Sequence, residues 1–226
     1  MSLSRGARNR LRDVRDSLRA LRTYALTQGF QGRALANFCR GKSGLLLNIG
    51  CGPLTNSGWI NIDYEPRDAN SFYFDVRNGL PLVDGTVKHI HSEHFLGYLD
   101  YEEALKFLRD CSRMLETGGT MRIIVPDFEK YVRAYAAGDA AFFNALRHLG
   151  GAVQPLTTKA MVCNQTCRLG GVYKFSWDFE TLEQAALSCG FSQVVRSKIN
   201  DTPPNFAIDG QDWWRPFESL YANLLK

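Results

Sequence analysis

The sequence predicts an α/β fold with a doubly wound, mostly parallel sheet. The short apolar run Leu45–Ile49 breaks into Gly50 and Gly52, as expected for a strand buried on both faces and followed by a loop. Further short apolar runs alternate with stretches of helical periodicity, which is the order of strands and crossover helices in a parallel sheet. The glycine loop is therefore expected at the carboxyl edge, where such sheets bind ligands.

A second apolar run, Trp59–Ile62, ends in Asp63, and a carboxylate at the tip of the second strand is placed to bind ribose hydroxyls. Only Pro53–Gly58 separate the two runs, which is too short for a crossover helix. A dinucleotide needs a third glycine and a helix N-terminus facing its pyrophosphate, and this stretch has neither. It also has no lysine or arginine, so a nucleoside cofactor without phosphate, such as S-adenosylmethionine, fits better.

Four further observations come in order along the chain, namely the stretches Gly50–Gly52, Gly58–Asp63, Phe74–Pro81 and Arg113–Gly119. Together they resemble class I S-adenosylmethionine-dependent methyltransferases, in particular a bacterial type-11-like branch with a shortened first connection. The resemblance covers about residues 44–130. It implies a Rossmann-like, seven-stranded sheet whose last strand, Ser219–Leu225, lies antiparallel between the fifth and sixth strands. It also implies S-adenosylmethionine as cofactor and S-adenosylhomocysteine as product.

The candidate cofactor-binding residues follow the expected carboxyl edge. They are Asn48, Gly50, Cys51, Gly52, Asp63, Asp75, Val76 and His94. The resemblance places Asp75 near the adenine amino group, with the Val76 backbone alongside. A helix N-cap or turn residue is the alternative role for Asp75.

The candidate catalytic residues are His94 and Asp127. Relatives often carry His-x-Leu-Glu-His-Leu after the fourth strand, whereas this chain has Gly97 and Tyr98 at the Glu and His positions. His94 is a candidate for lining the methyl-transfer centre or for a general base, with a structural histidine as the alternative. Asp127 follows the fifth strand and either orients a substrate hydroxyl or amine, or caps the helix Phe128–Ala137.

Residues 41–226 are expected to form one domain, with a substrate-side insertion at about 139–177. A helix is expected from Ala140 to Leu149, and the glycines and polar residues that follow, as far as Tyr173, favour a long loop or lid. The substrate-side candidates are Tyr98, Tyr173, Lys174 and Trp177, with ordinary packing as the alternative for the aromatic residues. Tyr98 and Trp177 could present aromatic faces to a sulfonium.

Two long helices have clear boundary signals. Tyr101–Leu115 has an apolar stripe, with Asp100 and Glu103 forming a capping box and Gly118-Gly119 expected as the stop. Asp178–Cys189 is expected as a capped helix with Gly190 as its stop.

Residues 1–40 are expected to form a basic, amphipathic helical arm. They carry nine arginines and two aspartates, a charge of +7, while the remaining residues carry 18 basic and 21 acidic side chains. Gly29 and Gly32 are expected to interrupt the helix. Such an arm binds an anionic membrane surface, a nucleic acid or an acidic partner, or it packs on the domain or on the second copy of a homodimer.

The composition favours a cytoplasmic protein, because no apolar run approaches eighteen residues and the N-terminus lacks the apolar centre of a signal peptide. Six scattered cysteines fit reduced thiols. Cys163 and Cys167 have a spacing that zinc can use, but no second pair accompanies them, so no metal site is predicted.

The function favoured by the sequence is methyl transfer to an oxygen or nitrogen of a small molecule or, from the resemblance alone, a glycan precursor. A non-catalytic S-adenosylmethionine-binding partner or regulatory subunit is the alternative that the altered Gly97-Tyr98 pair supports. A nicotinamide-dependent oxidoreductase is disfavoured by the six-residue connection. Nucleic-acid methylation is supported only by the basic arm, since the chain lacks an Asn-Pro-Pro-Tyr or Asp-Pro-Pro-Tyr motif.

Overall fold

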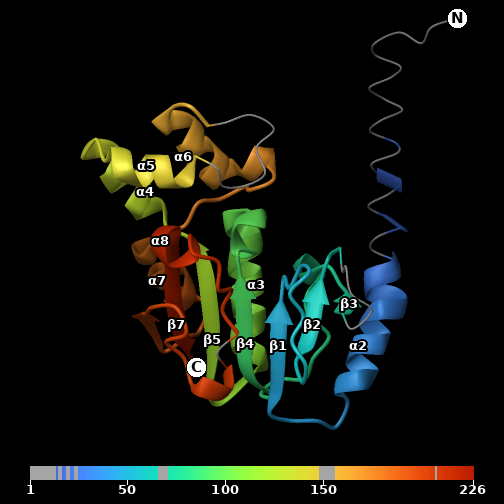
Figure 1. Cartoon of the computed structure of the whole chain (residues 1–226). Helices are drawn as coiled ribbons and strands as arrows, with labels where there is room; N and C mark the ends of the chain where they lie inside the picture. The colour runs from blue at the N-terminus through green and yellow to red at the C-terminus, as the bar shows by residue number, and fades with distance from the viewer. Residues whose placement is uncertain are drawn as a thin grey trace, which may run out of the picture.

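A computed structural model describes residues 25–65, 71–147, 156–206 and 208–226, together with Val14, Ser17, Leu18, Leu21 and Arg22. These residues form a seven-stranded sheet in the order β3-β2-β1-β4-β5-β7-β6 (Figure 1). The strands are β1 (Leu45–Ile49), β2 (Ile60–Asp63), β3 (Ser71–Tyr73), β4 (Val87–Glu93), β5 (Leu115–Pro126), β6 (Gln193–Arg196) and β7 (Ser219–Leu225). Strand β7 is antiparallel to both of its neighbours, and the other pairings are parallel. The expected Rossmann-like sheet with an antiparallel last strand is confirmed.

The helical elements connect these strands. They are the π-helix η1 (Ala25–Gln31), α2 (Gly32–Cys39), α3 (Tyr101–Met114), α4 (Phe128–Ala136), α5 (Ala140–Leu146), α6 (Lys159–Arg168), α7 (Phe179–Ser188) and α8 (Arg215–Glu218). Short 3₁₀ turns are η2 (Val76–Asn78), η3 (Leu96–Tyr98), η4 (Leu169–Gly171) and η5 (Pro204–Phe206). The predicted capping box of α3 is present, and Asp178 caps α7 by accepting a hydrogen bond from the Thr181 amide.

One face of the sheet is packed by α3 and α7. Helix α3 turns Ala104, Leu108 and Cys111 inward, and α7 turns Leu182 and Ala185 inward, all with 0% exposure. These side chains recur at helical spacing, so each helix buries one continuous stripe. This face provides the main apolar core of the domain.

The opposite face carries a row of polar side chains. Asn61, Asn48, His91, Arg122 and Asn223 are direct register partners across β2, β1, β4, β5 and β7. Register partners on adjacent strands point to the same face, so the five side chains form one line across the sheet. The irregular segment between β6 and α8 contacts this face instead of a crossover helix.

Three details of the sequence-based prediction are wrong. Gly118-Gly119 does not stop α3, which ends at Met114, because Leu115 already takes an extended conformation and pairs with Val87 in the sheet. Gly29 lies inside η1 and does not interrupt it. The expected long loop contains α6, whose first turn is capped by the Thr158 side chain.

Helices α4, α5 and α6 lie together beyond the carboxyl ends of β4 and β5 (Figure 1). They have a small core of their own that is separate from the core under the sheet. It contains Tyr131, Ala134, Phe142, Phe143, Leu146, Leu156 and Val162. The described part of the segment expected as a loop or lid, residues 156–173, therefore packs against α4 and α5.

The prediction of a basic arm falls mostly outside the described residues. Val14, Leu18 and Leu21 are helical, and each side chain is more than half exposed. Among the helices that the structure describes, none has the length and apolar character needed to cross a membrane.

Candidate functional site

A cleft with a volume of about 570 Å³ opens at the carboxyl ends of β1, β2 and β4. This volume is within the usual range of small-molecule sites. Among the sequence-predicted residues, the cleft brings together Gly50, Gly52, Asp63, Asp75, Val76, His94 and Tyr98. Val172, from the segment after α6, completes one wall.

The two glycines have different roles in the loop after β1. Both have positive φ, +72° at Gly50 and +51° at Gly52, which a residue with a Cβ rarely adopts. A Cβ at Gly50 would lie 2.4 Å from Cγ of Phe95, whereas a Cβ at Gly52 would meet nothing within 4 Å. Gly50 therefore allows the loop to pack on Phe95, and Gly52 leaves backbone open to a ligand.

Asp63 is held by the loop that it faces. Its Oδ2 accepts a hydrogen bond from the Gly52 amide at 2.8 Å, and its Oδ1 accepts one from the Glu65 amide at 2.7 Å. A carboxylate can accept about four hydrogen bonds, so each oxygen keeps one site. The geometry suits a pair of vicinal hydroxyls such as those of ribose.

Asp75 is bound by Arg77, a residue that the sequence analysis missed. Its Oδ1 accepts from the Arg77 amide at 3.1 Å and from Nε at 2.8 Å, while Oδ2 accepts from Nη2 at 2.6 Å. Asp75 thus caps the short turn η2, and one acceptor site remains on Oδ2. Arg77 also lies 3.8 Å from Glu103, which pairs with Lys174 at 2.7 Å.

Asn48 and Cys51 do not line this cleft. The Asn48 Nδ2 donates to the Leu54 carbonyl at 2.8 Å and to Asn61 Oδ1 at 3.1 Å. The Cys51 thiol is buried, 3.7 Å from the Ser71 hydroxyl. Both side chains contact the loop that carries the glycines, and neither lines the cleft.

His94 lies at the inner end of the cleft in the left-handed region, with φ of 51°. Its Nε2 is 3.0 Å from the Ser219 hydroxyl, and its ring meets Trp214 edge to face at 5.5 Å. Burial, reinforced by the nearby charge of Arg215, lowers the pKa of His94 to about 3. The imidazole is therefore neutral at pH 7, with one nitrogen able to accept a proton.

Asp127 is separate from the cleft. Its side chain is 1% exposed and accepts a hydrogen bond from the Glu129 amide at 3.2 Å, at the start of α4. Burial raises the pKa of Asp127, and the charges of Lys130 and Arg196 oppose that shift. These contacts show that Asp127 caps α4.

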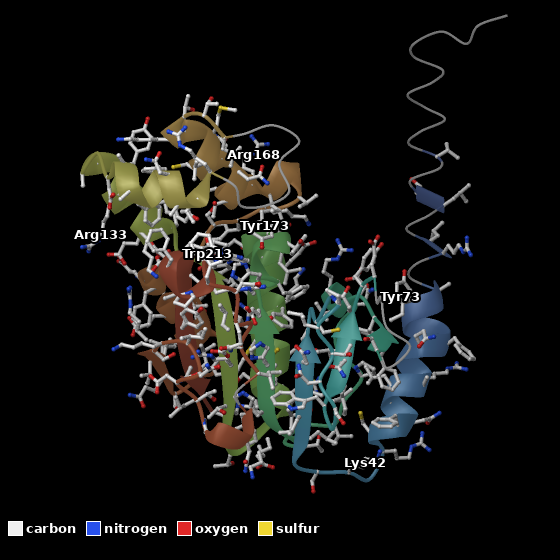
Figure 2. The ribbon with its side chains drawn as sticks, viewed as in Figure 1. Lys42, Tyr73, Arg133, Arg168, Tyr173 and Trp213 are labelled. Carbon is white, nitrogen blue, oxygen red and sulfur yellow. The ribbon has the colours of Figure 1, made fainter. Side chains whose placement is uncertain are left out.

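The four substrate-side candidates differ in burial and in the groups that they contact. Tyr98 lines the cleft and meets Tyr173 edge to face at 4.8 Å. The Tyr173 hydroxyl donates to the His94 carbonyl at 3.0 Å, and Figure 2 shows Tyr173 at this edge of the sheet. Lys174 forms the partly exposed pair with Glu103, and Trp177 is 1% exposed within the main core.

Glu218 is a further residue that the sequence analysis missed. It is 2% exposed and lies 3.5 Å from Nε2 of His94, although the two residues are 124 positions apart. Burial raises the pKa of Glu218 to about 7. The sequence carries no motif around it, and only the insertion of β7 beside β5 brings it next to His94.

No group of three or more His, Cys, Asp or Glu side chains within the described ranges has an arrangement that could hold a metal ion. Cys163 and Cys167 are free thiols on α6.

Neither a protein-family profile nor a curated protein sequence matches the chain. Solved structures match it over nearly its whole length. A methyltransferase from Archaeoglobus fulgidus that depends on S-adenosylmethionine (SAM) is 14% identical, with a TM-score of 0.50, covering 92% of this chain and 99% of that one. The chain has the fold of SAM-dependent methyltransferases.

Two further solved structures match the chain with TM-scores below 0.50. A SAM-dependent methyltransferase from Thermotoga maritima, described as a possible histamine N-methyltransferase, is 15% identical, with a TM-score of 0.49 and coverage of 95% and 97%. Phosphoethanolamine N-methyltransferase 2 of Haemonchus contortus, solved with S-adenosyl-L-methionine, is 13% identical, with a TM-score of 0.45. That match covers 86% of this chain and 51% of the other.

Proposed function

We propose that the chain transfers the methyl group of S-adenosylmethionine to an oxygen or nitrogen of a small-molecule or glycan-precursor acceptor. The observation that carries the proposal is the convergence of Gly52, Asp63 and Asp75 on one cleft. Each residue follows or ends a different strand. The two carboxylates keep unfilled acceptor sites, and the space beside the Gly52 Cα is open. The fold of the solved methyltransferases supports the same reaction.

The described residues fit the parts of S-adenosylmethionine. Asp63 would accept the two ribose hydroxyls, and the remaining site on Asp75 Oδ2 would accept one hydrogen from the adenine amino group. The open backbone at Gly52 would allow the rest of the cofactor close approach. When bound, the cofactor supplies a methyl group on sulfonium, which is transferred as the carbon–sulfur electron pair returns to sulfur.

The protein's task is then to bind and orient the acceptor. Holding two reactants in line can contribute about 7–11 kcal/mol of the barrier. Tyr98 and Val172 border the cleft, and Tyr173 braces the His94 carbonyl, so the substrate-side insertion at about 139–177 contributes to this orientation. His94 is the candidate base of the site, and Asp127 acts through the position of α4.

The test is titration calorimetry with S-adenosylmethionine and S-adenosylhomocysteine, with NAD as the comparison ligand. Asp63→Ala should weaken binding of both sulfur nucleosides by about 2–3 kcal/mol, because the ribose loses a charged acceptor. Asp201→Ala replaces an exposed aspartate of the β6–α8 connection and should leave the affinity unchanged.

Two outcomes would redirect the proposal. Binding of NAD and of neither sulfur nucleoside would show that the cleft serves a different cofactor. Tight binding of S-adenosylmethionine without transfer to any of a panel of alcohols, amines and sugars would favour the non-catalytic binding partner or regulatory subunit.

A further inference from the structure

A chain of hydrogen bonds runs from His94 into the interior, away from the cleft. His94 Nε2 lies 3.0 Å from Ser219 Oγ, which in turn donates to Glu218 Oε1 at 3.1 Å. The direct separation of His94 Nε2 and Glu218 Oε1 is 3.5 Å. A buried carboxylate therefore stands directly behind the imidazole that lines the cleft.

Hydroxyl groups hold the other side of this carboxylate. Glu218 Oε2 accepts from the Tyr131 hydroxyl on α4 at 2.8 Å, and the same hydroxyl accepts from Thr166 on α6 at 3.0 Å. Apart from His94, no basic side chain in the described residues lies within 4 Å of Glu218. Hydrogen bonds, and not an ion pair, therefore stabilise the charged form of Glu218. Because no ion pair holds the carboxylate in its charged form, its pKa can lie near neutrality.

The elements packed around Glu218 bring several charged or titratable groups. They are Lys130 and Tyr131 on α4, Cys167 on α6, Tyr173 after η4, Arg215 on α8 and His94 after β4. Burial raises the pKa of Glu218 to about 7 despite the opposing hydrogen bonds and the charges of Arg215 and Lys130. Burial lowers the pKa of His94 to about 3. As the pH falls, Glu218 therefore gains a proton before His94 does.

We propose that His94 and Glu218 act as one proton-accepting unit, in which His94 faces the methyl acceptor and Glu218 holds the proton. This inference rests on the proposed methyl transfer. It assigns a role to Glu218, a residue far from the cofactor-binding loops, and it gives a reason for the close contact of β7 with the segment after β4.

The proton path is balanced along the observed contacts. In the proposed unit, neutral His94 carries its hydrogen on Nε2, because Ser219 uses its own hydrogen to reach Glu218 and can then only accept from His94. None of the described residues hydrogen-bonds to Nδ1, so that nitrogen can accept a proton. As the acceptor forms its bond to the methyl carbon, its proton passes to Nδ1. The Nε2 proton moves to Ser219 Oγ, and the Ser219 proton moves to Glu218 Oε1. His94 and Ser219 are neutral before and after, and Glu218 changes from carboxylate to acid.

The test is a pH titration of the ¹⁵N-histidine-labelled protein by NMR, which needs no methyl acceptor. The signals of His94 are identified by their loss in His94→Gln. His94 should remain a neutral Nε2–H tautomer from pH 5 to 9, and its ¹⁵N shifts should change with a midpoint near pH 7 as Glu218 titrates. Glu218→Gln should abolish that change, and Glu102→Gln, an exposed glutamate on α3, should keep it.

A second variant tests the pair if Glu218→Gln folds poorly. Tyr131→Phe removes one donor to the charged carboxylate and should raise the midpoint by about one pH unit. A midpoint that stays unchanged in Tyr131→Phe, or a His94 that itself protonates near pH 6.5, would overturn the proposal.

Calorimetry on the same samples separates the two hypotheses. If S-adenosylmethionine binds and the His94 signals do not respond to Glu218, only the proton-accepting unit is wrong. If the signals respond and no sulfur nucleoside binds, the proposed function is wrong, and the catalytic use of the pair is overturned with it.

Discussion

The two faces of the sheet are built from opposite chemistry. On one face, α3 and α7 bury apolar stripes against the strands. On the other face, Arg122 and Asp209 form an ion pair at 0% exposure, and His89 stacks on Phe206 at 4.6 Å. The difference follows from the connections, because a crossover helix can bury an apolar stripe, whereas an irregular segment exposes backbone groups that need polar partners.

Arg122 is fully hydrogen-bonded at the centre of the polar face. Its five N–H groups have five acceptors, namely two oxygens of Asp209, the Ser197 hydroxyl, the Asn223 side chain and the Lys198 carbonyl. The same face leads to Glu93, which pairs with Arg215 next to the cleft. The face without crossover helices is therefore held by a connected polar network, and this network reaches Arg215 beside the candidate site.

The largest effect is expected from breaking the buried ion pair. Arg122→Met should lower the free energy of unfolding by about 3–5 kcal/mol, because Asp209 is left buried without its partner. The double variant Arg122→Met/Asp209→Leu should recover at least half of that loss. Urea unfolding followed by circular dichroism measures both, and a loss below about 1 kcal/mol in the single variant would contradict the polar-network account.

The apolar face is tested by a cavity. Leu108→Ala should cost about 2–5 kcal/mol, since the side chain is 0% exposed between α3 and the sheet. Leu187→Ala on α7 is the matched control, because its side chain is 46% exposed, and its cost should stay within about 0.5 kcal/mol. Equal costs for the two variants in urea unfolding would show that α3 is not packed as described.

The smallest effect is expected in the pH dependence of stability, through His89 on the polar face. Burial lowers the pKa of His89 to about 3, so between about pH 6.5 and 3 the unfolded chain binds a proton that the folded chain does not. The free energy of unfolding should therefore fall on acidification by up to about 1.4 kcal/mol per pH unit from this residue. His89→Phe keeps a ring opposite Phe206 and should show a shallower fall.

The measurement for that prediction is urea unfolding of both proteins at pH 7, 6 and 5. His94 also has a lowered pKa but is retained in the variant, so the difference between the two slopes isolates His89. Equal slopes of the free energy of unfolding against pH for the two proteins would mean that His89 binds a proton in the folded state as readily as in the unfolded chain.

Much of the fold could be predicted from local signals. The run Leu45–Ile49, the capping box at Asp100 and the stripe of α3 each depend on residues close in sequence, and the structure confirms them. The stop at Gly118-Gly119 was wrong because pairing of Leu115 with Val87 ended the helix earlier, which is a long-range contact. The loop expected after α5 was also wrong, because this segment contains α6, which packs on α4 and α5.

The residues of the candidate site also differ in whether a local sequence signal predicts them. Gly52, Asp63 and Asp75 sit at strand ends, so their convergence follows once the strand order is known. Glu218 has no such signal, because its role depends on which side chains meet it from distant segments. Arg77 binds Asp75, which is only two residues away, so its role did have a local signal.

The sequence by itself determined the strands, the capped helices α3 and α7 and the glycine loop, since these depend on periodicity, turn chemistry and the absence of a Cβ at particular positions. Only the tertiary structure decided that Arg122 would meet Asp209 and that Glu218 would lie behind His94. Buried polar groups must find partners wherever the chain brings them, and these partners lie 87 and 124 residues apart. No local pattern encodes such a pairing.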